Sequence, residues 1–234
     1  MKIYIVSCNP GRVERLFNAS KSLNLDFEVV NSPLSTDEEV QERGKKAFET
    51  EKAYPGGLAA TLGHLKAMRK FVDSEKELSI IIEDDVRFHN DWNKYILIIE
   101  EYFKKSEMNV MTIGFLSKTT DKNLYNNTIQ PLNIGENLEV YENVGVSNPW
   151  GCQCYMIKRE FALKFLDLFE DKEITDSYSG DFVTDIVIYD PVIGCRRSTL
   201  LKPIAIECPY EQSIVGSNNK PPIQSLVNPY EFKI

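Results

Sequence analysis

The chain has 234 residues, of which 42% are hydrophobic and 26% are charged, and its formal net charge is −8. This length buries a full core and suits one domain, or one domain with a subdomain. The negative charge argues against broad nucleic-acid binding, which needs a positive surface against phosphates. No run of about 18 apolar residues occurs, so we expect no transmembrane segment.

Five cysteines are scattered along the chain, at positions 8, 152, 154, 195 and 208. An odd and dispersed set suits reduced thiols better than a disulfide framework, so we expect a cytoplasmic protein. Cys152 and Cys154 could form half of a metal site, but neither a second pair nor a nearby histidine completes it along the sequence. Structural thiols are therefore the favoured interpretation.

Hydrophobic periodicity predicts strands that alternate with helices. The expected strands are 2–7, 26–30, 79–86, 109–115, 138–147 and 151–157. The expected helices are 12–23, a long amphipathic one after Pro55-Gly56-Gly57, 91–105 and 159–169. The polar stretch 35–52 suits a solvated helix or a mobile loop, 117–137 suits a long surface loop, and the proline-containing tail from 202 suggests no regular elements.

This alternation predicts an α/β fold, an α/β/α sandwich of the Rossmann type with a mainly parallel central sheet. No linker divides the sequence, so we expect one domain over residues 1–234.

The acidic triplet Glu83-Asp84-Asp85 directly follows the apolar run 79–82. Side chains alternate across a strand, so Glu83 and Asp85 are expected on one side and Asp84 on the other. Two carboxylates at a strand end can hold Mg²⁺ or Mn²⁺, which prefer oxygen ligands, and ligands of open α/β sheets collect at that end. The alternative is a polar turn with solvated acids, and the triplet taken alone favours it.

The triplet gains weight from the segment Pro55-Gly56-Gly57-Leu58-Ala59-Ala60-Thr61-Leu62-Gly63-His64-Leu65 ahead of it. The pair resembles glycosyltransferase family 25, the bacterial lipooligosaccharide galactosyltransferases and the procollagen galactosyltransferases. That family carries a Gly-Glu-Ile-Gly-Cys-x-x-Ser-His helix and then a strand ending in Glu-Asp-Asp. His64 and the spacing match, whereas Ala59-Ala60 replaces Gly-Cys and Gly63 replaces the Ser.

Flanking segments are similar to the same family. The opening strand with Arg12 and Arg15, the segment from Trp150 to Arg159, and Gly180-Asp181-Phe182 each resemble a stretch of it. The resemblance implies a GT-A fold, a UDP-sugar donor with galactose favoured, a divalent cation (Mn²⁺ or Mg²⁺), inversion at the anomeric carbon, and a glycan or glycoprotein acceptor.

The same resemblance implies a nucleotide-sugar-binding half at about 1–115 and an acceptor-binding half at about 138–234. Two alternatives stay open. One is a GT-A enzyme with another donor, such as glucose or N-acetylhexosamine, and the other is a catalytically idle module that binds a sugar nucleotide or a carbohydrate.

Within this resemblance, Glu83 and Asp85 are the expected metal ligands. The nucleotide-sugar is expected to contact polar side chains and small residues near the first strand, the helix and the triplet, namely Ser7, Asn9, Arg12, Gly57, Thr61, His64 and Asp84. The alternatives are structural: a surface helix for Arg12, and a satisfied, partly buried histidine for His64.

An inverting transfer needs a base that takes the proton of the acceptor hydroxyl. Asp181 and Asp185 are the candidates, and they share a face if 180–189 is helical. The β-branched residues of that stretch disfavour a helix. The alternatives are a helix N-cap for Asp181 and a surface salt bridge for Asp185.

Overall fold

The computed structural model describes residues 1–114, 130–142, 151–170, 182–207 and 232. Within these ranges the strands are β1 (Ile3–Ser7), β2 (Phe27–Asn31), β3 (Leu78–Glu83), β4 (Val86–Phe88), β5 (Val110–Gly114), β6 (Leu132–Gly135), β7 (Leu138–Glu142), β8 (Cys154–Lys158), β9 (Arg197–Leu200) and β10 (Ala205–Glu207). The helices are α1 (Pro10–Ser20), α2 (Glu38–Glu49), α3 (Pro55–Asp73), α4 (Trp92–Lys105), α5 (Arg159–Phe169) and α7 (Thr184–Val187), with 3-10 turns η1 (Lys21–Leu23) and η2 (Pro191–Ile193).

The strands form a single mixed sheet in the order β2-β1-β3-β8-β5-β9-β7-β6, and β10 pairs with both β4 and β5. Strand β1 is parallel to β2 and β3, and β5 is parallel to β9. Strand β8 is antiparallel to both of its neighbours, β3 and β5. Strands β1, β2, β3, β5 and β9 therefore point the same way, so their carboxyl ends lie at one edge of the sheet.

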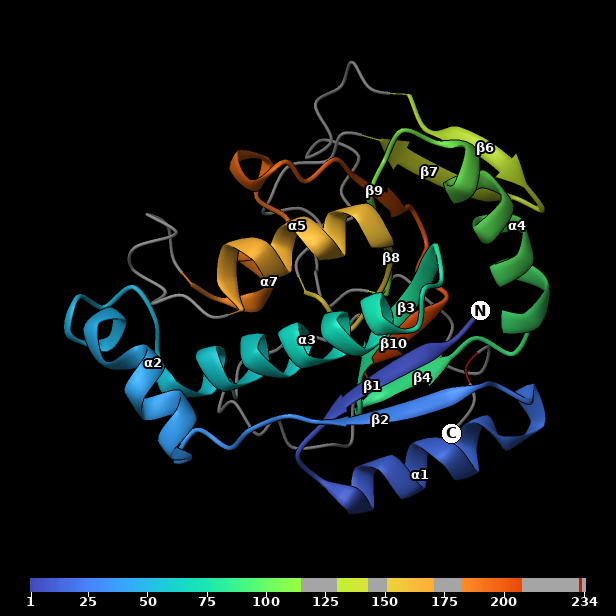
Figure 1. The fold of residues 1–234 in the computed structure, drawn as a ribbon. Coiled ribbons are helices and arrows are strands. Elements are labelled where there is room, and N and C mark those ends of the chain that lie inside the picture. The colour runs from blue at the N-terminus through green and yellow to red at the C-terminus, as the bar shows by residue number, and fades with distance from the viewer. Residues whose placement is uncertain (115–129, 143–150, 171–181, 208–231, 233–234) are drawn as a thin grey trace.

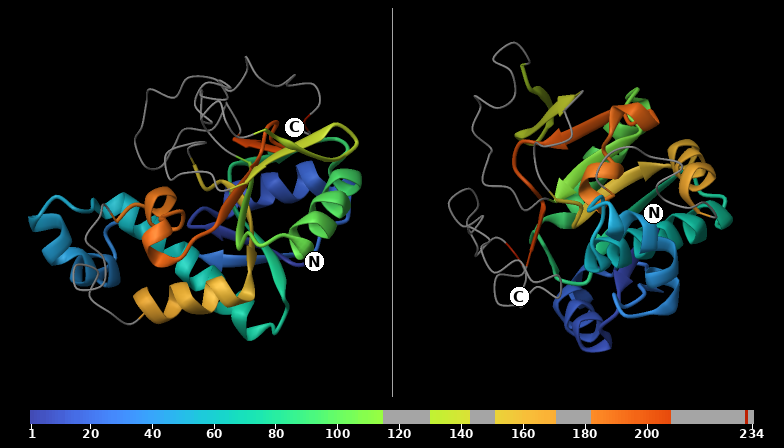
Figure 2. Two further views of the ribbon diagram at one scale, coloured as in Figure 1. Left: turned by 90° about the horizontal axis from the view of Figure 1, so that it is seen from above. Right: turned by 90° about the vertical axis from the view of Figure 1, so that its left-hand side faces the viewer.

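Helices cover both faces of the sheet because the buried strands are apolar on both sides. Tyr4 and Val6 of β1 belong to the hydrophobic cluster under α3 and α5. Ile3 and Ile5, the alternate positions, belong to the cluster under α1 and α4. Figure 1 shows α3 and α5 side by side, and Figure 2 shows α1 on the opposite side of the sheet. The α/β/α sandwich expected from the sequence is confirmed.

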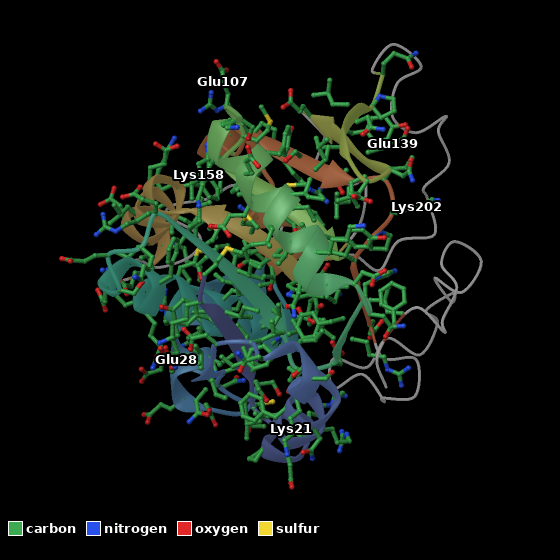
Figure 3. All side chains as sticks on the ribbon, turned by 90° about the vertical axis from the view of Figure 1, so that its right-hand side faces the viewer. Lys21, Glu28, Glu107, Glu139, Lys158 and Lys202 are labelled. Atoms are coloured by element: carbon green, nitrogen blue, oxygen red, sulfur yellow. The ribbon has the colours of Figure 1, made fainter. Side chains whose placement is uncertain are left out.

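The surface is charged, as the composition suggests. Figure 3 views the side covered by α4, where the exposed side chains of Lys21 and Glu107 lie at the rim of the molecule. No helix in the described part of the chain combines the length and the apolar character needed to cross a membrane.

Three expected elements differ from the structure. The strand expected over 79–86 ends at Glu83, and β4 begins only at Val86 after a two-residue turn. Residues 132–135, expected within a loop, form β6 and pair with β7. The proline-containing tail contributes β10, which fits the sheet because its prolines lie outside the strand. Pairing with a neighbouring strand stabilises such segments as strands even where their local propensity does not favour one.

Candidate functional site

A cavity of about 260 Å³ lies at the carboxyl ends of β1 and β3, beside the N-terminal turns of α3. Most of the residues expected at a functional site line it, although they come from five separate segments. These residues are Ser7, Arg12, Gly57, His64, Glu83, Asp84, Asp85 and Asp185.

The three acids of the triplet face different partners, in a pattern that the alternation of side chains along a strand did not predict. Asp84 Oδ1 lies 3.2 Å from Arg12 Nη1, and Asp85 Oδ2 lies 3.7 Å from the same nitrogen. Glu83 Oε1 instead lies 3.6 Å from His64 Nε2. The expectation that Asp85 shares a side with Glu83 and not with Asp84 is wrong, because β3 ends at Glu83 and both aspartates belong to the turn.

Arg12 is 6% exposed, although it lies in the first turn of a surface helix. The side chain of Asn9 caps α1 by accepting hydrogen bonds from the backbone nitrogens of Gly11 and Arg12. This cap starts the helix directly after β1, which carries the Arg12 guanidinium over the carboxyl end of the sheet. The expected alternative of a surface-helix arginine is therefore excluded.

Asp84 is held from two sides. Ser7 Oγ donates a hydrogen bond to Asp84 Oδ2 at 2.5 Å, and Arg12 donates to the other oxygen. Burial raises the pKa of Asp84, while the Ser7 hydrogen bond and the Arg12 charge act in the opposite direction. The turn is thus fixed by hydrogen bonds and buried, and its acids are not solvated.

His64 is fully buried in α3, and its two ring nitrogens have different neighbours. Nδ1 lies 2.9 Å from the hydroxyl of Tyr155, and Nε2 lies 3.9 Å from Cys152 Sγ. Cys152 Sγ is in turn 3.4 Å from Glu83 Oε1. Burial and the negative charge of Glu83 raise the pKa of the Cys152 thiol well above its usual value.

Asp185 reaches the cavity from α7, a short helix that packs on α3. The hydroxyls of Thr61 and Thr184 lie 3.0 Å apart and join the two helices. Burial raises the pKa of Asp185 to about 6, and the charge of Glu83 acts in the same direction. A carboxyl group with this pKa is ionised at neutral pH yet basic enough to take a proton.

Two expected site residues, Asn9 and Thr61, do not line this cavity. Asn9 lines an adjoining cavity of about 630 Å³, which shares Ser7 and Cys8 with the first. Thr61 does not line either cavity, since its hydroxyl is bonded to Gly57 O and to Thr184. Asp181 is outside the described residues.

Cys152 and Gln153 line the cavity, and sequence reasoning missed both as site residues. They precede β8, whose antiparallel pairing with β3 brings them next to Glu83; the backbone nitrogen of Glu83 donates to Gln153 O at 2.9 Å. Cys152 is 88 positions from His64 along the chain. Only the pairing of β3 with β8 could have revealed that contact.

Two glycines of α3 lie close against neighbouring side chains, and one of them, Gly63, stands where the family pattern has serine. A Cβ on Gly63 would lie 2.4 Å from Ser32 Oγ and 2.6 Å from Val6 Cγ1, so the serine of the family pattern does not fit here without displacing these neighbours. A Cβ on Gly57 would lie 2.8 Å from the ring of Tyr54. Both glycines permit close packing, Gly57 at the wall of the cavity and Gly63 against Val6 and Ser32.

The cavity is strongly acidic. Among its described lining residues four are carboxylates (Glu83, Asp84, Asp85 and Asp185), and the one guanidinium is that of Arg12. Carboxylates gathered in a partly enclosed space repel one another unless cations compensate them. The donor set therefore suits a hard divalent cation, which oxygen ligands bind.

Solved structures to which this chain shows some similarity include a protein from STIV, a glycosyltransferase involved in the glycosylation of the major capsid of PBCV-1, and UDP-glucose pyrophosphorylase complexed with UDP-glucose. The first has 13% identity and a TM-score of 0.44, and the match covers 85% of this chain and 80% of the other. The second has 12% identity and a TM-score of 0.43, with coverage of 90% and 93%. The third has 12% identity and a TM-score of 0.41, with coverage of 85% and 71%.

No curated protein sequence matches the chain. The sequence model of glycosyltransferase family 25, described as an LPS biosynthesis protein, matches residues 1–184. The matched region includes β1, α3 and the acidic triplet, and it ends one residue before Asp185. The chain belongs to glycosyltransferase family 25.

Proposed function

We propose that the chain transfers a hexose, with galactose favoured, from a UDP-sugar to a glycan or glycoprotein acceptor with inversion at the anomeric carbon. The observation that carries the proposal is the meeting of Arg12, the acidic triplet and Asp185 in one cavity at the carboxyl edge of the sheet. Nucleotides bind at this edge in open α/β sheets. The adjoining cavity, lined by Asn9, adds room for an extended donor.

We assign the cation to Glu83 and Asp85. They face different neighbours, His64 and Arg12, but both carboxylates line the same cavity and suit Mn²⁺ or Mg²⁺. When bound, the cation neutralises the diphosphate that leaves the sugar. Asp84 orients Arg12, and the guanidinium supplies a positive charge that a phosphate can meet. Ser7, Gly57 and His64 line the same wall and are proposed to contact the nucleotide-sugar.

We propose Asp185 as the general base. Its carboxyl lies at the cavity, and its pKa of about 6 leaves it ionised at neutral pH. In that state it accepts the proton of the acceptor hydroxyl as the hydroxyl attacks the anomeric carbon. Asp181, four residues earlier, stays the alternative base.

The test is release of UDP from a panel of UDP-sugars in the presence of Mn²⁺ and candidate acceptors. We expect turnover that depends on the cation and falls at least about 100-fold in Asp85→Ala, the loss typical of removing one group that stabilises transition-state charge. Asp73→Ala, an exposed change at the end of α3, is the matched control and should retain full activity.

Two results would count against the proposal in different ways. UDP binding without turnover of any sugar would favour the idle binding module. Full turnover in Asp85→Ala would remove the assignment of the cation to this carboxylate.

A further inference from the structure

We propose that His64, Glu83 and Cys152 form a binding site for a zinc-like divalent cation in the wall of the same cavity. One atom of each residue, His64 Nε2, Glu83 Oε1 and Cys152 Sγ, lies within 4.8 Å of the other two. The site rests on this geometry and not on the transfer reaction. It shares Glu83 with the proposed Mn²⁺ or Mg²⁺ ligands but adds a nitrogen and a sulfur ligand.

The three separations suit tetrahedral coordination. They are 3.9 Å between sulfur and nitrogen, 3.4 Å between sulfur and oxygen, and 3.6 Å between nitrogen and oxygen. Bonds of about 2.3 Å to sulfur and about 2.0–2.1 Å to nitrogen and oxygen, at tetrahedral angles, place such ligands about 3.3–3.6 Å apart. Only the 3.9 Å separation between sulfur and nitrogen exceeds this range, and small side-chain rotations shorten it.

The imidazole is already oriented for coordination. The Tyr155 hydroxyl lies 2.9 Å from Nδ1, and the two rings stack with centroids 5.6 Å apart. When Nδ1–H donates to Tyr155, the lone pair of Nε2 points toward the cluster. Metal-binding histidines generally have their second nitrogen fixed in this way.

The mixed donor set decides which class of cation fits. Mg²⁺ and Ca²⁺ prefer oxygen ligands alone, whereas a set of imidazole, thiolate and carboxylate suits zinc and similar ions. All three residues line the cavity, so a fourth coordination position would face it. An open position of this kind lets a zinc ion bind water or a substrate oxygen.

Cobalt(II) provides the test, because a thiolate bound to cobalt gives a charge-transfer absorption that oxygen and nitrogen ligands do not give. The probe is Co²⁺ added to the full chain, with Cys152→Ala as the diagnostic variant. Two matched controls are Cys8→Ala, which changes another cavity-lining thiol, and Cys154→Ala, whose side chain is buried in the opposite core.

We expect the band in the wild type and both controls and its loss in Cys152→Ala. Zinc affinity, measured by competition with a chromophoric chelator, should fall more than the roughly 10- to 100-fold typical of losing an outer-shell partner. A wild type without the band, or an unchanged band in Cys152→Ala, would overturn the proposal.

A second measurement needs no variant, in case Cys152→Ala does not fold. X-ray absorption at the zinc edge of the loaded wild type should show one sulfur at about 2.3 Å. A shell of oxygen and nitrogen alone would refute the site.

The outcomes also separate this site from the proposed reaction. Cation-dependent sugar transfer by a protein without the thiolate band would refute the zinc-like site and leave the transferase proposal intact. The band in a protein that neither binds UDP nor transfers sugar would support the site and refute the transferase proposal.

Discussion

Replacing Arg12 with Met should destabilise the protein strongly, because the change removes the cation between Asp84 and Asp85 while keeping much of the apolar stem. All three side chains are less than 10% exposed, and the guanidinium lies 3.2 and 3.7 Å from the two carboxylates. Breaking a buried ion pair from one side costs about 3–5 kcal/mol. Ser7 still donates to Asp84, so we expect the lower end, about 3 kcal/mol. For a chain of this size the melting temperature should fall by about 6–12 °C.

Urea unfolding followed by circular dichroism measures this loss, with Arg15→Met on the exposed side of α1 as the control. Burial already raises the pKa of Asp84 in the wild type, and the variant loses the Arg12 charge that acts in the opposite direction, so the pKa lies further above the unfolded value of about 3.9. The loss of unfolding free energy in the variant should therefore be largest near neutral pH and should shrink as the pH falls toward 4. Adding Asp84→Asn should restore part of the stability. A loss below about 1 kcal/mol, or a deficit independent of pH, would refute the account of the turn.

Further predictions concern the base and the packing of α3. Asp185→Asn should lower transfer by about 10²–10⁴-fold. The wild-type rate should rise with pH through an apparent pKa at or below about 6, since burial and the charge of Glu83 raise the pKa of Asp185 while the charges of Arg197 and a bound cation lower it. Full activity of Asp185→Asn would move the role to Asp181. Gly63→Ser should cost about 1–3 kcal/mol in urea unfolding through its clash with Ser32 and Val6, and unchanged stability would contradict that packing. Thr61→Val should cost about 1–3 kcal/mol in the same assay, because the buried Thr184 hydroxyl loses its partner, and a cost below about 0.5 kcal/mol would contradict the α3–α7 link.

Much of the fold follows from local pattern. The buried strand 3–7 is almost entirely apolar, and α3 shows helical periodicity after Pro55, so both elements were predicted close to where they begin. Local pattern missed β9 and β10 because they are short and pair with strands distant in sequence. It missed β6 because that short, largely exposed strand pairs only with β7, in a hairpin. Local propensity contains no information about such pairing.

The sequence predicted which residues meet at the cavity better than it predicted how they are arranged. The acidic triplet, Arg12 and His64 do meet in one cavity. The expectation that Glu83 and Asp85 lie on one side was wrong, because the alternation of strand side chains was extended beyond Glu83, where β3 ends. Cys152 was interpreted as a structural thiol because its neighbours, His64 and Glu83, come from other elements. A single sequence does not reveal contacts between residues so far apart along the chain.

A crystal structure of the chain with UDP and Mn²⁺, with manganese located by anomalous scattering, tests the central claim most directly. We predict manganese at the carboxylates of Glu83 and Asp85, with the UDP diphosphate beside it and the nucleotide extending past Ser7 and Arg12. Manganese away from these carboxylates, or UDP bound outside the cavity, would contradict the proposed donor site.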